Sequence, residues 1–156
     1  MAGNSRALIT ASLTGGIVAG TIDIGVACLI NGRSIPFILH AIAGGLLAQR
    51  SFAGGVATAV LGAALQEGMG ILIAAIYVVA GEWLPELRRR WVGFGLAYGV
   101  VIFFVMNYVV VPLSAWRRFP HFSPAKFAAN LAAMLLFGLI VAFFARRRSV
   151  LAAQAA

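Results

Sequence analysis

The sequence predicts an all-α fold, a polytopic membrane protein with four transmembrane helices in one bundle and a short extra helix at about 35–49. Of the 156 residues, 62% are hydrophobic and only 10% are charged, and the mean hydropathy is +0.99. An ordinary soluble domain has roughly 45–50% and 25%. The apolar residues also gather into runs that can cross about 30 Å of hydrocarbon, which takes about 20 helical residues. We therefore expect one integral membrane domain over residues 1–156.

Four apolar runs are long enough to span a bilayer, at about 7–30, 56–81, 91–112 and 127–145. Each run stops at polar or helix-breaking residues. Asn31-Gly32-Arg33 follow the first run, Pro112 closes the third, and Arg146-Arg147-Arg148 follow the fourth. The spans show no internal repeat, which disfavours a transporter built from two matched halves.

A fifth apolar stretch, at about 35–49, is too short to span and carries Pro36 near its start. We favour a helix that lies along the membrane interface, as amphipathic surface helices do. A re-entrant segment and a strongly tilted span remain as alternatives. The tilted span would change the topology of everything that follows it.

The distribution of basic residues predicts the orientation. With four spans, both termini and the 82–90 connection share one side, here the terminal side; the 31–55 and 113–126 connections share the other, here the loop side. The terminal side carries Arg6, Arg88, Arg89, Arg90, Arg146, Arg147 and Arg148, and the loop side carries Arg33, Arg50, Arg117, Arg118 and Lys126. This small excess favours both termini in the cytoplasm.

Small residues at helical spacing predict where the spans pack. Gly16 and Gly20 lie one turn apart in the first span, and Gly95 and Gly99 in the third. Such pairs let two helix backbones approach closely in lipid. Asp23 follows on the same face as Gly16 and Gly20, so its carboxyl group is expected to face a protein neighbour rather than lipid.

Acids and amides within the spans form the candidate ligand-binding or ion-binding site, namely Asp23, Gln66, Glu67, Asn107 and Asn130. Asp23, Asn107 and Asn130 lie within about two turns of the loop-side ends of their spans, and Glu67 lies nearer the middle. No Lys or Arg within a span can pair with Asp23 or Glu67, so protonation or hydrogen bonding to amides, Thr21 or Thr58 is expected. We predict a polar cavity open to the loop side with the 35–49 segment as its cover. The alternative is a packed seam in which these groups only join helices.

Other candidate sites have weaker support. His40 and His121 fall in the two loop-side connections and could hold a metal or haem, but no further ligands accompany them. Arg88, Arg89 and Arg90 could bind lipid headgroups, although a role in setting the topology is simpler. The lone Cys28 excludes an intrachain disulfide.

The sequence predicts no enzymatic activity and no cofactor. It lacks a Gly-x-Ser-x-Gly, a His-Glu-x-x-His and a Walker motif. An intramembrane hydrolase that uses Asp23 and Glu67 is the one chemical option. The net charge of +8 comes from clusters that flank the spans, so we expect the lipid bilayer rather than nucleic acid as the partner.

Four stretches within about residues 14–115 form a recognisable series, namely "GGIVAGTIDI", "SFAGGVATAVLGAAL", "AAIYVVA" and "LAYGVVIFFVMNYVVVPLSA". Together they resemble a family of small, uncharacterised bacterial inner-membrane proteins with four predicted spans. The most specific pieces are the Ala-Gly-Thr-x-Asp-Ile stretch around Asp23 and the stretch from Met106 to Ser114. The resemblance implies a bacterial cytoplasmic membrane and a four-span bundle, and it implies no reaction or ligand.

Two functions remain open from the sequence. The favoured one is a non-enzymatic helix-bundle subunit that binds another membrane protein, lipid or a second copy of itself through small-residue faces. The alternative is a small oligomeric transporter or channel in which Asp23 and Glu67 couple to protons or cations. A cavity between the polar side chains would favour the second, and a dry, packed centre would favour the first.

Overall fold

The computed structural model of the chain describes residues 2–154, and within them the side chains of residues 5–147. Its elements follow one another as α1 (Ala2–Asn31), α2 (Ile35–Leu47), η1 (Ala48–Ala53), α3 (Gly55–Trp83), α4 (Glu86–Arg89), α5 (Trp91–Val105), η2 (Met106–Val110), α6 (Val111–Leu113) and α7 (Pro124–Gln154). Of these, η1 is a 3₁₀ helix and η2 is a π-helical turn that continues α5 into α6. The described residues contain no strand.

The predicted fold class is confirmed. Four helical segments of the described chain are long and apolar enough to cross a membrane, Ser5–Asn31, Gly55–Trp83, Trp91–Leu113 and Pro124–Arg147. Each extends slightly beyond the predicted apolar run, because helical hydrogen bonding continues through polar residues that end the hydrophobic pattern. At the start of α7, for example, Pro124 occupies the first turn and the Lys126 amide donates to the Ser123 hydroxyl at 3.4 Å.

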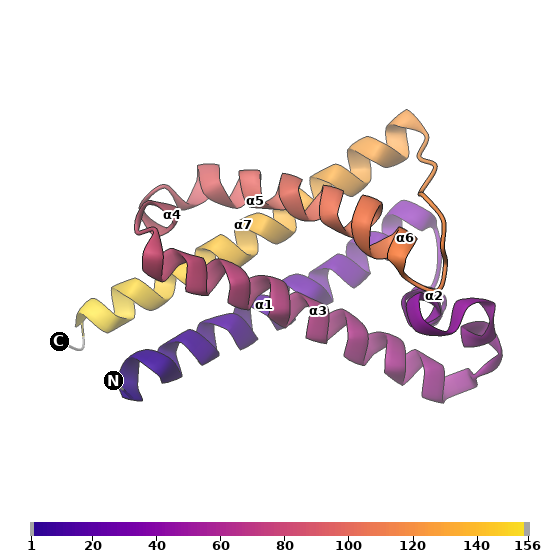
Figure 1. Cartoon of the computed structure of the whole chain (residues 1–156), viewed down its shortest axis with the longest axis horizontal. Helices are drawn as coiled ribbons and strands as arrows, with labels where there is room; N and C mark the ends of the chain where they lie inside the picture. The colour runs from indigo at the N-terminus through magenta and orange to yellow at the C-terminus, as the bar shows by residue number, and fades with distance from the viewer. Residues whose placement is uncertain (1, 155–156) are drawn as a thin grey trace.

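The four long helices pack in the spatial order α3, α1, α7, α5 (Figure 1). The start of α1, the end of α7 and the short α4 lie at one end of the molecule, and α2 and α6 lie at the other (Figure 1). This arrangement matches a four-span topology with both termini on one side. The Arg148 side chain, counted in the orientation argument, lies outside the described residues.

Glycines determine how closely α1 approaches α3. A Cβ added to Gly16 would lie 2.6 Å from the backbone nitrogen of Ile71 and 2.8 Å from the carbonyl carbon of Gly70, and one added to Gly70 would lie 2.8 Å from the Gly16 oxygen. Gly20 instead gives room to a side chain, since its added Cβ would lie 3.1 Å from Oε2 of Glu67. The first predicted glycine pair therefore lies entirely against α3.

The α5–α7 contact is built in the same way. A Cβ on Gly95 would lie 2.9 Å from the Cβ of Ala142, and one on Gly99 would lie 2.8 Å from the Cα of Leu135. The facing residue on α7 is Gly138, whose added Cβ would lie 2.7 Å from the Gly99 nitrogen. Backbone atoms thus approach across this interface with no side chain between them, as in other lipid-embedded helix pairs.

Two tyrosines join α3 and α5 toward the terminal side. The Tyr98 hydroxyl donates to the Ile73 carbonyl at 2.7 Å, and the Tyr77 hydroxyl donates to the Leu87 carbonyl at 3.0 Å. The two rings pack with their centroids 5.0 Å apart, and Tyr77 is only 2% exposed. Beyond these tyrosines, α3 and α5 do not pack closely along their loop-side halves.

The α2 helix packs on α3 and is held by the turn after α6. The Trp116 indole N–H donates to the Ala41 carbonyl at 3.1 Å, and the Ala115 amide donates to the Gly45 carbonyl at 2.8 Å. With 13 residues, α2 is about 20 Å long, which is too short to cross the hydrocarbon layer. The helix ends at Leu47, two residues before the predicted boundary, so the tilted-span alternative is not supported.

Candidate functional site

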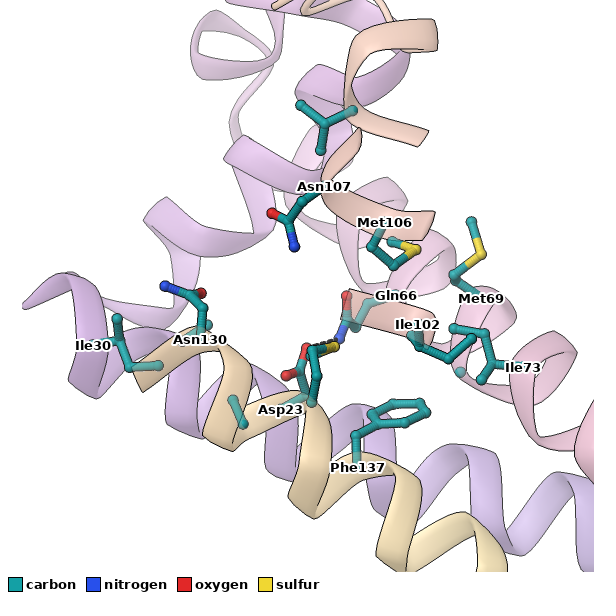
Figure 2. Close-up of a pocket in the computed structure, with 15 residues that line it drawn as sticks. Asp23, Ile30, Gln66, Met69, Ile73, Ile102, Met106, Asn107, Asn130 and Phe137 are labelled. Carbon is teal, nitrogen blue, oxygen red and sulfur yellow. Dashed lines mark hydrogen bonds between the residues drawn. The ribbon is translucent and has the colours of Figure 1, made fainter. Parts of the chain in front are cut away.

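A cavity of about 210 Å³ lies where α3 and α5 separate (Figure 2). Its polar lining consists of Asp23 from α1, Gln66 from α3, Asn107 from η2 and Asn130 from α7. All four long membrane segments thus contribute one acid or amide. Four of the five polar residues singled out in the sequence therefore surround one space rather than a closed seam.

Asp23 and Gln66 join α1 to α3 at the wall of this cavity. The Gln66 Nε2 donates to Oδ2 of Asp23 at 2.9 Å (Figure 2). The same nitrogen donates to the Gly20 carbonyl at 3.4 Å. The contact is possible because the α1 and α3 backbones approach closely at Gly16 and Gly70. The other carboxyl oxygen, Oδ1, receives no hydrogen bond from a described residue.

Asn107 and Asn130 both use their amide N–H on their own helix. The Asn107 Nδ2 donates to the Phe103 carbonyl at 2.8 Å, and the Asn130 Nδ2 donates to the Lys126 carbonyl at 2.7 Å. In the described part of the chain nothing donates to their amide oxygens. Asn107 lies in the π-helical turn η2, a local irregularity that is frequent at functional sites.

The rest of the cavity lining is apolar and includes the thioethers of Met69, Met106 and Met134 and the ring of Phe137 (Figure 2). These residues were not predicted from the sequence. The signal was present, because Met134 and Phe137 follow Asn130 at helical spacing, as Met69 and Ile73 follow Gln66. The three methionines are all those of the chain apart from Met1.

The expectation that Glu67 lines the same cavity is wrong. Glu67 is absent from the lining and faces the other side of α1, where the Thr21 hydroxyl donates to its Oε1 at 3.1 Å. Its Oε2 is buried beside Gly20 and has no hydrogen-bond partner among the described residues. Neighbouring residues on a helix point about 100° apart, so Gln66 and Glu67 reach different residues of α1, Asp23 and Thr21 respectively.

The expected cover is also wrong, because α2 contributes none of the cavity-lining residues. The α2 helix instead approaches α3 closely at Gly62, where an added Cβ would lie 2.7 Å from the Leu39 carbonyl carbon. The loop-side wall is formed instead by Ile30, Asn107, Val111 and Asn130. Thr58, considered as a partner for the carboxyls, bonds to the Ser51 carbonyl at 2.7 Å.

The two histidines have separate surroundings. A ring nitrogen of His40 lies 3.0 Å from the Thr58 hydroxyl, and the His40 ring packs on Phe52 at 5.9 Å. His121 is exposed in the segment before α7. Within the described residues, no three His, Cys, Asp or Glu side chains come together as metal ligands.

The three arginines around α4 differ in their availability to headgroups. Arg88 pairs with Glu82 at 2.5 Å and both side chains are about three-quarters buried, at 25% and 27% exposed. Arg89 and Arg90 are 82% and 80% exposed and lie 3.8 and 3.6 Å from Glu86, distances at which surface pairs contribute little. Arg89 and Arg90 thus remain the headgroup candidates of this cluster.

The chemistry of the cavity lining suits the binding of a solute. Among the described residues that line it, Asp23 is the one ionisable side chain, and none carries a hydroxyl, thiol, imidazole or amine. The two-carboxylate hydrolase that the sequence left open needs a second acid beside Asp23, and Glu67 is elsewhere. A carboxyl group with amide neighbours in an apolar wall can hold a solute by charge and hydrogen bonds.

Comparison with protein-family models, with curated proteins and with solved structures gives no match to this chain. The resemblance to small bacterial inner-membrane proteins therefore stays a prediction.

Proposed function

We propose that this multi-pass membrane protein is a small-solute transporter whose binding site is the cavity between α1, α3, α5 and α7. The observation that carries the proposal is the cavity itself, with Asp23, Gln66, Asn107 and Asn130 around a space of about 210 Å³. Polar groups are costly within a bilayer, and those of transport proteins typically line a substrate path. A purely structural role would instead pair these groups in a closed contact.

The distribution of polarity along the cavity supports a path that is open toward the loop side. Asn107 and Asn130 lie nearest the loop-side ends of their segments, and the apolar side chains of Ile73, Ile102 and Phe137 lie deeper. Beyond them, the Tyr77–Tyr98 contact fills the space between α3 and α5. A solute therefore enters from the loop side, and transport requires the tyrosine contact to separate.

Water access to the cavity tests this proposal. In a Cys28→Ser background, an Asn107→Cys thiol is expected to react with a membrane-impermeant methanethiosulfonate added to either side of the membrane, because transport exposes the cavity to both sides. Thiolates form in water and not in hydrocarbon. The measurement is the labelled fraction in inside-out and right-side-out vesicles.

The matched control is Val101→Cys on α5, a residue that is 53% exposed in the structure and turned to lipid in the membrane. It is expected to stay unlabelled from both sides. Labelling of the Asn107→Cys variant from one side only, or from neither, would contradict transport.

We also propose a bacterial cytoplasmic membrane with both termini in the cytoplasm. The support is the greater number of basic residues on the terminal side, where Arg89 and Arg90 are well exposed next to α4.

The outward face of α3 favours a second candidate function, helix docking in a larger membrane assembly. Val60 and Leu72 are 62% and 55% exposed on this face, with the small residues Ala64 and Gly68 between them. A Cβ added to Gly68 would meet nothing within 4 Å, so no contact within the described part of the chain requires glycine. Glycine lowers helix stability by about 1 kcal/mol relative to alanine, and close approach of another transmembrane helix would account for it.

The Gly68→Leu variant tests the docking role. We expect it to keep the fold and to lose at least about 90% of the assembly or of the co-purified partner, since leucine holds the second helix away from the α3 backbone. Size-exclusion chromatography and tagged purification from mildly solubilised membranes measure this. Gly25→Leu, at an equally open position of α1, is the control. A monomeric wild type that recovers no membrane protein would contradict the role.

A further inference from the structure

We infer that the solute of this cavity is a small organic monocation, a protonated amine or a quaternary ammonium with apolar substituents. The inference rests on the proposed function and names the class of ligand for the same site. Three properties of the cavity lead to it, namely its charge, the hydrogen-bonding groups that remain free, and its apolar walls.

The charge of the cavity favours a cation. Asp23 is the one ionisable group of the lining, and none of the ion pairs between described residues involves it. Among the described residues, the one hydrogen bond to its carboxyl group comes from the neutral amide of Gln66, at 2.9 Å. A carboxylate surrounded by hydrocarbon has weak solvation and strong electrostatic interactions. A ligand with one positive charge neutralises it, whereas an anion would be repelled.

The free hydrogen-bonding atoms favour a ligand that donates. Asn107 and Asn130 each donate to a carbonyl of their own helix, at 2.8 and 2.7 Å, which leaves their amide oxygens without a donor in the described chain. Oδ1 of Asp23 likewise receives no hydrogen bond from a described residue. An ammonium group carries N–H or polarised C–H donors and no acceptor, so it complements these three oxygens.

The size and the apolar walls favour an organic ligand over a metal ion. About 210 Å³ is the volume of about seven water molecules, and it is smaller than the roughly 300–1,000 Å³ of drug-sized pockets. A hard cation such as Ca²⁺ takes about six to eight oxygen ligands, but much of this lining is hydrocarbon, thioether and aromatic, from Ile73, Met69, Met106 and Phe137. Alkyl groups on the cation would contact these side chains favourably.

Three probes that share a tert-butyl group but differ in charge test whether binding depends on the charge of the ligand. Tert-butylammonium, tert-butanol and pivalate are titrated by calorimetry into the full-length protein in nanodiscs. We expect binding of tert-butylammonium and at least about tenfold weaker binding of the neutral and the anionic probe. Equal binding of tert-butanol, tighter binding of pivalate, or no binding of any probe would overturn the assignment. Binding of K⁺ or Ag⁺ without tert-butylammonium would also overturn it, in favour of an inorganic cation.

Two variants test which carboxyl group of the protein binds the cation. Asp23→Asn keeps an oxygen acceptor for Gln66 and removes the charge, so we expect a loss of affinity for tert-butylammonium of roughly 10- to 100-fold. Glu67→Gln, which removes the carboxylate outside the cavity, is expected to leave affinity within about twofold. Unchanged affinity of the Asp23→Asn variant would overturn the inference.

Failure of this inference is distinguishable from failure of the proposed function. If the Asn107→Cys thiol is labelled from both sides but tert-butylammonium does not bind, transport stands and the ligand class is wrong. If that thiol is unreactive from both sides, the transport proposal itself is contradicted.

Discussion

Gly138→Ala is expected to lower the free energy of unfolding by about 3 kcal/mol, although it adds only one methyl group. The added Cβ would lie 2.7 Å from the nitrogen and 2.9 Å from the Cα of Gly99, and it would also overlap the carbonyl oxygen of Gly95. These are backbone atoms of α5, which cannot turn aside as a flexible side chain can. The α5 and α7 backbones must therefore move apart at Gly95 and Gly99.

Unfolding in bicelles, followed by tryptophan fluorescence, measures this effect. Trp91 starts α5 and packs on Phe143 of α7 with ring centroids 5.9 Å apart, so its emission reports on the same interface. The control is Gly93→Ala, on α5 but with nothing within 4 Å of the added Cβ. It is expected to leave stability unchanged or raise it by up to about 1 kcal/mol. Equal effects at Gly93 and Gly138 would contradict glycine-mediated packing.

The spans could be predicted from the sequence because the bilayer imposes a simple rule. A backbone in hydrocarbon must satisfy its hydrogen bonds internally, so an apolar run of sufficient length is a helix. The short helix at 35–49 was also predicted correctly, but its expected role as cover of the cavity was wrong. Its position depends on Trp116 bonding to Ala41 and on the close approach of Leu39 to Gly62, contacts between segments far apart in the sequence.

The candidate site could also be predicted only in part. Periodicity correctly placed Asp23 toward a protein neighbour, where it contacts Gln66. It could not decide between Gln66 and Glu67 as that neighbour, because the rotation of α3 about its axis is set by the Gly16–Gly70 contact. Gln66 lines the cavity, whereas the carboxyl group of Glu67, the next residue of α3, accepts a hydrogen bond from Thr21.

The cavity itself has no signature in the sequence of any single helix. It exists because α1 packs on both α3 and α7 while α3 and α5 meet only toward the terminal side, at Tyr77 and Tyr98. Helix separation is a property of the whole bundle. The three methionines of the lining could have been noticed at helical spacing from Gln66 and Asn130, but they are equally typical of a filled core.

Ala133→Phe is expected to abolish solute binding without unfolding the protein. Ala133 belongs to the cavity lining and is 9% exposed, on the same face of α7 as Asn130 and Phe137. A phenyl ring at this position extends into the existing space of about 210 Å³, so it fills a void instead of displacing backbone as an added methyl at Gly138 does. We expect the labelling rate of the Asn107→Cys thiol to fall at least about tenfold and the titration with tert-butylammonium to show no binding.

Ala132→Phe is the matched control for this prediction, because the neighbouring side chain is exposed on the outward face of α7. There a phenyl ring enters the lipid and is expected to change neither labelling nor binding. Both variants should unfold within about 1 kcal/mol of the wild type, since cavity filling is favourable where the ring fits and lipid-facing positions tolerate aromatic residues. Wild-type affinity and labelling in the Ala133→Phe variant would mean that solute does not occupy this cavity, whatever its charge. Loss of function in both variants would point to a general disturbance of α7, because the two rings share a helix and differ only in the direction they face.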